Sequence, residues 1–249
     1  LVPRSVFWGL KKEEAEMNSA LRLADFARMI DHTYLKIDGG PVEVTRVCLE
    51  AEKHGFAAVA VFPTAVPLAA QLLKGTNVKV CAALAFPLGS YPPEIKAAEA
   101  SDAIVKGATE LDMVVNIGAV KAGNWSLVEE ELTRFREATR GYIAKLILEC
   151  CYLTSEEKRK LCILAKDIGL DFVKTSTGFV KGGGATVEDV KLMHEVVGSH
   201  LGVKAAGGIR TLDQALAMIK AGATRLGTSS GVQLFKEFEA RYGEEVKLG

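Results

Sequence analysis

VKAAGGIRTLDQALAMIKAGATRLGTSSG, residues 203–231, contains one complete strand–helix–strand unit. The run VKAAGGI is apolar and partly β-branched, and a second apolar run, RLGTSSG, closes the stretch. Between them, Thr211 and Gln214 fit a capping box at the start of a helix, and Gly222 stands where a C-terminal cap is wanted. A helix that joins two apolar strands is typical of neighbouring parallel strands with a crossover connection.

Similar apolar runs recur along the chain, and amphipathic segments separate them. The runs cover residues 29–35, 57–63, 78–87, 110–116, 144–150, 172–178, 203–209 and 225–231. Continuous apolar strands that alternate with helices indicate a parallel sheet covered on both faces. Eight such units in roughly 250 residues is the size of a (β/α)8 barrel. No G-x-G-x-x-G turn supports the competing doubly wound sheet that binds dinucleotides. We therefore expect an α/β fold, a (β/α)8 TIM barrel forming a single domain over residues 17–249, with an extra N-terminal helix in ALRLADFAR (20–28).

Composition and charge exclude several other classes of protein. The formal net charge is +0, so nothing in the overall charge favours binding to nucleic acid or to an acidic membrane surface. The longest uncharged stretch, residues 56–73, contains two prolines and divides more naturally into a strand and a helix than into a membrane span. Five cysteines without a C-x-x-C spacing favour a cytoplasmic location. The start LVPRS resembles a protease site left by a purification tag, and we expect residues 1–16 to be such a remnant or a flexible N-terminus.

Charged and polar side chains stand within or directly after the apolar runs. In a barrel of this kind the active site lies at the C-terminal ends of the strands. Reading those ends in chain order gives Asp31, Asp112, Asn116, Glu149, Lys174, the hydroxyls of residues 175–177, Lys204, Ser229 and Ser230. Lysines and acids are costly to bury inside apolar strands, so packing alone does not explain this set. We interpret it as one catalytic cluster.

Lys174 and Lys204 lie on consecutive predicted strands, at similar heights if the two runs are aligned. Two amines held close together disfavour each other's protonated form, and partial burial acts in the same direction. Either effect brings a lysine pKa from about 10.4 toward roughly 7–8, where a neutral nucleophilic amine is populated. With Asp112 as the compensating anion and proton carrier, this set predicts imine chemistry on a carbonyl substrate.

Glycine-rich turns end the last two predicted strands. AAGGIR (205–210) and GTSSG (227–231) each lead into a helix, and barrel loops at these positions often bind phosphate through backbone N–H groups. Ser229 and Ser230 add hydroxyl donors, so we expect a phosphorylated substrate. GTSSG also matches the nucleophile elbow G-x-S-x-G, but no histidine follows Ser229, which excludes a hydrolase triad in its usual order. The four histidines show no metal-ligand spacing, and we expect no metal.

Several motifs resemble those of the deoxyribose-phosphate aldolase family: ELDMVVNIG, LILECCYLT, FVKTSTGF, GATVEDV, VKAAGGIRT and RLGTSSG. The likeness runs from about Leu21 to Tyr242. It implies a class I aldolase, a carbon–carbon lyase without metal or cofactor. Such an enzyme reversibly cleaves 2-deoxy-D-ribose 5-phosphate to D-glyceraldehyde 3-phosphate and acetaldehyde.

The resemblance also implies roles for individual residues. By motif, Lys174 forms the Schiff base, Lys204 is its partner and Asp112 completes the proton relay. The positions that match substrate-binding residues are Asp31, Gly178, Gly207, Gly208, Ser229 and Ser230. Some relatives carry lysine directly after TSTG, where this chain has Phe179, with Lys181 two residues on. We also expect a homo-oligomer, either a dimer or a tetramer.

Two other classes of protein stay open on the sequence. One is a phosphate-binding TIM-barrel isomerase, or another sugar-phosphate enzyme without imine chemistry, in which Lys174 is only an electrostatic contact. The other is a non-catalytic barrel that serves binding or assembly. Borohydride trapping with substrate separates these classes from the aldolase.

Overall fold

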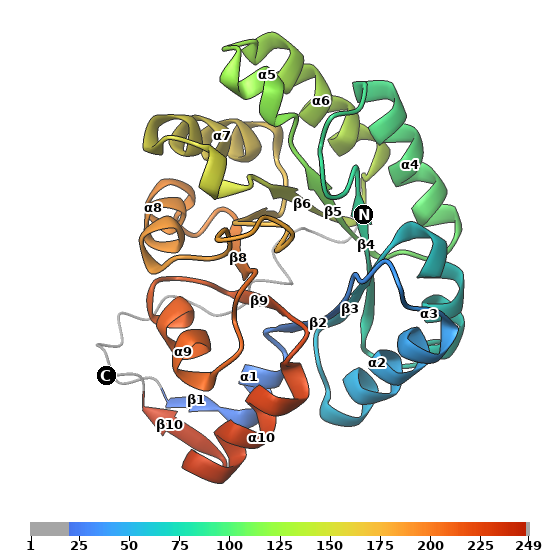
Figure 1. Cartoon of the computed structure of the whole chain (residues 1–249), viewed down its shortest axis with the longest axis vertical. Coiled ribbons are helices and arrows are strands. Elements are labelled where there is room, and N and C mark those ends of the chain that lie inside the picture. Colours follow the sequence, from blue (N-terminus) through green and yellow to red (C-terminus); the bar gives the residue numbers. More distant parts are fainter. Residues whose placement is uncertain (1–19, 248–249) are drawn as a thin grey trace.

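Eight parallel strands close into a barrel in the computed structural model, which describes residues 20–247 (Figure 1). The barrel strands, paired in chain order, are β2 (Ile30–Tyr34), β3 (Ala58–Val61), β4 (Lys79–Leu84), β5 (Glu110–Val114), β6 (Ile143–Ile147), β7 (Phe172–Lys174), β8 (Gly202–Ala206) and β9 (Arg225–Thr228). Every run expected to form a strand overlaps one of them, with β6 and β8 beginning one residue earlier than expected, so the predicted TIM barrel is confirmed. The predicted tag remnant or flexible segment, residues 1–16, lies outside the described residues.

Helices surround the barrel (Figure 1). They are α2 (Pro41–His54), α3 (Val66–Leu72), α4 (Pro93–Val105), α5 (Ile117–Lys121), α6 (Trp125–Ala138), α7 (Ser155–Ile168), α8 (Val187–Val197), α9 (Leu212–Lys220) and α10 (Gly231–Tyr242). The capping box predicted for α9 is present, because Thr211 Oγ1 accepts from the backbone N–H of Gln214 and the Gln214 side chain accepts from that of Thr211. Within residues 20–247, no helix has the length and apolar character that a membrane crossing requires.

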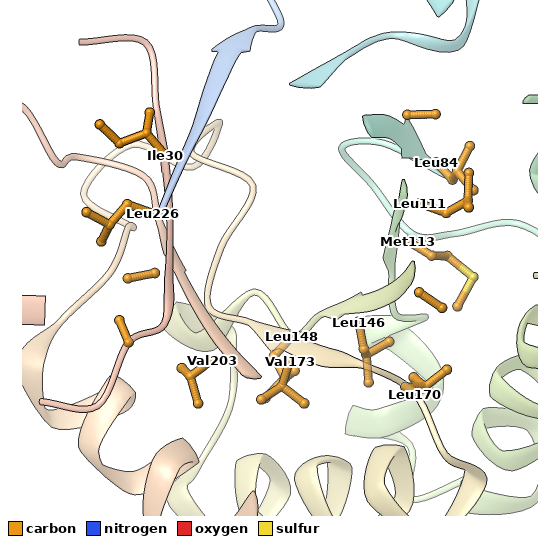
Figure 2. Packing of buried hydrophobic residues seen from close by; sticks show 14 of the residues in the cluster. Ile30, Leu84, Leu111, Met113, Leu146, Leu148, Leu170, Val173, Val203 and Leu226 are labelled. Carbon is orange, nitrogen blue, oxygen red and sulfur yellow. The ribbon is translucent and has the colours of Figure 1, made fainter. Parts of the chain in front are cut away.

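The main apolar core lies between the barrel and its helices rather than inside the barrel. Strand residues such as Leu111, Met113 and Val173 are fully buried in it (Figure 2). Side chains alternate across a strand, so the residues beside them, Asp112 and Lys174, face the barrel interior. Some apolar residues of the interior are small, as in the separate cluster of Ala58, Ala60 and Cys81. The barrel interior therefore has room for charged side chains.

The expected N-terminal helix over residues 20–28 is only partly right. Its first residues form a strand, β1 (Ala20–Arg22), and the helix α1 covers Leu23–Ala27 alone. β1 pairs antiparallel with β10 (Glu245–Lys247) in a two-stranded ribbon beside α1 and α10 (Figure 1). Local periodicity missed the strand because its pairing partner lies at the other end of the chain.

Candidate active site

The two lysines predicted to act together lie side by side, Lys174 at the end of β7 and Lys204 in the middle of β8. Lys174 and Lys204 are register partners in this strand pair, so the expected similar height is confirmed. Both side chains are buried. Asp112 reaches them from β5, and its Oδ2 accepts from Lys174 Nζ at 2.8 Å and from Lys204 Nζ at 2.7 Å. One carboxylate oxygen therefore holds both amines.

A third lysine, which the sequence reasoning missed, approaches Asp112 from β6. Lys145 Nζ donates to Asp112 Oδ1 at 2.8 Å and lies 2.5 Å from Glu110 Oε2. Two signals could have found this pair. Glu110 precedes Asp112 by two residues and so shares its face of the strand, and Lys145 is the register partner of Asp112 on the next strand.

Asp31 joins the same network from β2. It accepts hydrogen bonds from Lys204 Nζ and, at 2.6 Å, from Arg225 Nη1. Arg225 Nη1 also lies 3.3 Å from Glu110 Oε2. The network contains four cations and three carboxylates: Lys145, Lys174, Lys204, Arg225, Asp31, Glu110 and Asp112. When all of these groups are ionised, the barrel interior carries one surplus positive charge.

Burial and the neighbouring Lys204 weaken proton binding at Lys174. Burial lowers the pKa of Lys174, Asp112 raises it and Lys204 lowers it again, which leaves it below the ordinary lysine value. Burial also lowers the pKa of Lys204, but Asp112 and Asp31 outweigh that effect and raise it above the ordinary value. The pKa of Lys145 is raised well above it, because nearby Asp112 and Glu110 overcome burial. Lys174 is therefore the lysine of this network that gives up its proton most easily.

Three potential metal ligands converge deeper in the barrel, but they already lie in contact with cationic side chains of the protein. Atoms of Asp31, Cys81 and Glu110 lie within 4.8 Å of one another. Lys145 Nζ stands among them, 2.5 Å from Glu110 Oε2, 3.5 Å from Cys81 Sγ and 3.9 Å from Asp31 Oδ2. Burial raises the pKa of the Cys81 thiol to about 12, which disfavours the thiolate that a metal requires. This donor set fits an ammonium ion better than a divalent metal.

A cavity of about 230 Å³ opens above Lys174 at the C-terminal ends of the strands. Four of the six predicted substrate-binding residues line it together with Lys174: Gly178, Gly207, Gly208 and Ser229. Asp31 does not line the cavity, because it is buried in the ion network. Ser230 lies at the start of α10, where its backbone N–H donates to Thr228 Oγ1 at 2.9 Å.

The glycine turns of this cavity approach each other so closely that side chains are excluded. Gly207 has a φ of 87°, and a Cβ there would lie 3.0 Å from Gly184 Cα and 3.2 Å from Gly178 Cα. A Cβ on Gly184 would lie 2.8 Å from the Gly207 carbonyl oxygen. The glycines therefore bring three backbone segments together beside the cavity, as an anion site built from N–H groups requires.

Two cations that sequence reasoning missed, Lys36 and Arg210, also line the cavity. Lys36 follows β2, and Arg210 ends the AAGGIR turn after β8. Phe179 lines the same cavity at the position where some relatives carry lysine. Positive charge is therefore available to an anionic ligand from the turns after β2 and β8.

The other polar residues predicted at strand ends serve local structure. Glu149 Oε2 accepts from the Thr177 backbone N–H at 3.1 Å and from the Thr177 hydroxyl. Thr175 Oγ1 donates to the Ala206 carbonyl oxygen at 3.1 Å and so ties the turn after β7 to β8. Asn116 accepts from the Ala119 N–H as the N-cap of α5. These bonds fix the turns that surround Lys174.

Fold and site together define a barrel enzyme with a buried lysine of lowered pKa at the mouth of its barrel. The chain belongs to the DeoC/LacD family of aldolases, whose family model matches residues 26–237. It is 50% identical over 233 residues to a deoxyribose-phosphate aldolase of Caldanaerobacter subterraneus subsp. tengcongensis, covering 92% of this chain and 97% of the relative. A deoxyribose-phosphate aldolase of a Geobacillus species is 53% identical over 211 residues, covering 84% of this chain and 94% of the relative. The tetrameric structure of deoxyribose phosphate aldolase from Aeropyrum pernix superimposes with a TM-score of 0.80 at 31% identity, covering 88% of this chain and 92% of that one.

Proposed function

We propose that this chain is a deoxyribose-phosphate aldolase and that Lys174 forms its Schiff base. Relatives with this name are about half identical to the chain over most of its length. The observation that carries the proposal is the position of Lys174. Its pKa is lowered and it lines the cavity at the barrel mouth, whereas Lys145 and Lys204 lie beneath it with raised pKa values.

In the proposed mechanism Lys174 attacks the C1 aldehyde of 2-deoxy-D-ribose 5-phosphate. The carbonyl oxygen leaves as water, and the resulting protonated imine accepts the electrons of the C2–C3 bond as that bond breaks. A base removes the C3 hydroxyl proton, and glyceraldehyde 3-phosphate leaves. Lys204 and Asp112, in contact with each other at 2.7 Å, then serve to protonate the enamine, and hydrolysis releases acetaldehyde.

The proposed phosphate site is the glycine-rich side of the cavity. Gly178, Gly207, Gly208, Ser229 and Ser230 are assigned to it as donors of backbone N–H groups and hydroxyls. The close approach of the glycine turns supports this assignment. Lys36 and Arg210 would add charge there in place of the lysine that Phe179 replaces. Asp31 is assigned to the substrate hydroxyl, through the part of the network that it shares with Lys204.

Borohydride trapping tests this function directly. Borohydride reduces the imine between Lys174 and substrate to a stable secondary amine, so peptide mass spectrometry should find the adduct on Lys174. Lys181→Ala, which removes an exposed lysine of the turn after β7, is the matched control and should trap like the native chain. An isomerase without imine chemistry would instead convert a sugar phosphate and yield no reducible adduct. Turnover without an adduct on Lys174 would overturn the proposal.

We also infer a homo-oligomer in the cytoplasm. Ile37, Val42 and Leu49, in or next to α2, are 90%, 76% and 56% exposed, an apolar surface that a second copy could cover. The tetramer named for the Aeropyrum pernix relative supports assembly. The five unpaired cysteines fit a reducing compartment. Light scattering measures the assembly, and Val42→Asp with Leu49→Asp should shift it toward the monomer.

A further inference from the structure

Glu149 has an unusual backbone conformation just after β6. Its φ of 55° and ψ of 63° lie in the left-handed region, which residues other than glycine rarely adopt. Before it, the Leu148 N–H donates to the Lys174 carbonyl oxygen at 2.9 Å. After it, the Cys150 N–H donates at 2.9 Å to the carbonyl oxygen of Thr175, the residue next to Lys174. Glu149 is therefore an additional residue between two interstrand bonds, as in a β-bulge, and a bulge redirects a side chain.

The redirected carboxylate is buried and holds Thr177. Glu149 is 1% exposed, and its Oε2 accepts from the Thr177 backbone N–H at 3.1 Å and from the Thr177 hydroxyl. The hydroxyl oxygen of Thr177 in turn accepts from the Phe179 N–H at 3.1 Å. Burial of a carboxylate and a left-handed backbone are both costly. Such an arrangement is expected where the position of Thr177 matters for function.

Thr177 belongs to the turn that connects Lys174 to the glycine-rich side of the cavity. Thr177 and Gly178 line the cavity together with Lys174. The start of the turn is tied to β8, because the Thr175 hydroxyl donates to a β8 carbonyl oxygen at 3.1 Å. The end of the turn is tied to Glu149 through Thr177. The two attachments together fix the separation between the Lys174 amine and the proposed phosphate site at Gly178.

We propose that Glu149 is a positioning residue for the aldolase reaction, which holds Gly178 at the distance from Lys174 that the phosphorylated sugar spans. A substrate bound at one end as an imine and at the other through its phosphate needs both sites at a fixed separation. A displacement of about 1 Å can lower the rate by roughly a hundredfold. Acetaldehyde has no phosphate, so its imine with Lys174 does not need this separation. The inference rests on the proposed Schiff-base function of Lys174.

The reach and the charge of residue 149 can be varied separately. Glu149→Gln keeps the length of the side chain and an acceptor oxygen, so kcat/KM for 2-deoxy-D-ribose 5-phosphate should stay within about threefold of native, the cost of a neutral acceptor. Glu149→Asp keeps the charge but is one methylene shorter, and Glu149→Ala removes the carboxylate. In both, this kcat/KM should fall by roughly 10–100-fold. Unphosphorylated 2-deoxyribose should lose much less, and borohydride trapping of acetaldehyde on Lys174 should stay native.

Glu149→Gly separates positioning from stability. Glycine adopts the left-handed conformation without strain, so the Tm of this variant should lie about 2–4 °C above that of Glu149→Ala. Its loss of kcat/KM on the phosphorylated sugar should nevertheless equal that of Glu149→Ala. Glu99→Ala is the matched control, because Glu99 Oε2 also accepts a backbone N–H just after a strand, that of Ala85 at 2.7 Å, but lies outside the lining of the Lys174 cavity. It should keep the native ratio of kcat/KM on the two sugars.

Three results would overturn the inference. Recovery of kcat/KM together with Tm in Glu149→Gly, or equal losses on both sugars, would mean that Glu149 serves stability alone. A reversed order of the two conservative variants, with Glu149→Asp near native and Glu149→Gln impaired, would mean that charge matters rather than reach. Failure of the native chain to trap acetaldehyde on Lys174 overturns the proposed Schiff-base function instead. The failure of the inference and that of the function are therefore distinguishable.

Discussion

Buried lysines occur in two regions of this molecule, and the two regions differ in how many carboxylates surround the lysines. Between α4 and α6, Lys96 Nζ lies 2.7 Å from Glu131 Oε2, and both side chains are fully buried. Lys96 also donates to the Val114 carbonyl oxygen at 2.8 Å, and Glu131 accepts from the Asn116 N–H at 3.0 Å. This isolated pair thus holds the end of β5, the strand that carries Asp112. In the barrel, the lysines share several carboxylates.

The number of opposite charges decides which way each pKa moves. Burial lowers the pKa of Lys96 and raises that of Glu131, even though each group opposes the shift of the other. In the barrel, several carboxylates reverse the effect of burial at Lys145 and Lys204. Lys174 contacts Asp112 alone among those carboxylates in the described structure and shifts in the same direction as Lys96. Lys174, unlike Lys96, lines a cavity, so the comparison separates an amine held for structure from one available for chemistry.

Lys174→Met should cause the largest loss of activity of all the changes at the two groups of lysines. The Schiff base cannot form without the amine, so turnover should fall by roughly 10⁴-fold or more, the scale of losing a covalent nucleophile. Trapping should vanish while the circular dichroism spectrum stays native. Lys96→Met is the matched change at the other buried lysine, and its soluble fraction should still trap substrate on Lys174. Retention of even a few per cent of native turnover in Lys174→Met would contradict the Schiff-base role.

Asp112→Asn should have the next largest effect. The substitution keeps the shape of the side chain but removes the charge that Lys145, Lys174 and Lys204 share. Turnover should fall by about 10²–10⁴-fold, the range for loss of a proton-transfer group. Steady-state kinetics measure this loss, and Glu131→Gln provides the same chemical change in the isolated pair. A similar loss of kcat in both variants would mean that Asp112 acts only through stability.

In the isolated pair, Glu131→Leu should reduce the free energy of unfolding rather than the rate of catalysis. It leaves the Lys96 ammonium buried without its carboxylate, which typically costs about 3–5 kcal/mol. The double change Lys96→Met with Glu131→Leu removes both charges, so the free energy of unfolding in urea should lie closer to that of the native chain. If the double variant is no more stable than Glu131→Leu, then the bonds to Val114 and Asn116 matter more than the charges.

Lys204→Met should shift the pH dependence of trapping. Lys204 lowers the pKa of Lys174, so its removal should raise that pKa while Asp112 stays ionised. A rise of one unit reduces the neutral amine at pH 7 by about tenfold, and higher pH should restore it. Turnover should recover less than trapping, because the proton relay is also lost. Lys204→Arg keeps the charge, so it should trap better than Lys204→Met yet still turn over poorly. Native behaviour of both variants would make Lys204 a structural residue.

The smallest expected effect lies at the phosphate side of the mouth. In Ser229→Asp a carboxylate would face the bound phosphate, and about 1.4 kcal/mol of repulsion should raise KM for the phosphorylated sugar by about tenfold. Unphosphorylated 2-deoxyribose should lose much less. The ratio of the two KM values is therefore the readout, and equal losses on both sugars would mean that the turn only shapes the barrel.

The sequence predicted the barrel and the part of the site that lies at strand ends. Lys174, Lys204 and Asp112 could be found because each is a charged residue inside an apolar run. Lys145, Glu110 and Arg225 were missed because they lie deeper in the barrel and their significance depends on register between strands. The structure also revealed contacts between turns that are distant in sequence, such as that of Phe86 with Phe179. Local patterns carry no information about such contacts.

The β1–β10 ribbon has a mechanical consequence. Ala20 pairs with Lys247 at one end of the ribbon, and Arg22 pairs with Glu245 at the other. A force that pulls residues 20 and 247 apart therefore opens the ribbon like a zipper, one bond after another, instead of shearing all of its bonds together. The barrel strands meet in a closed ring with no free edge among β2–β9, so they bear no load until the ribbon has opened. The ribbon should therefore open at low force, while the barrel strands around Lys174 stay paired.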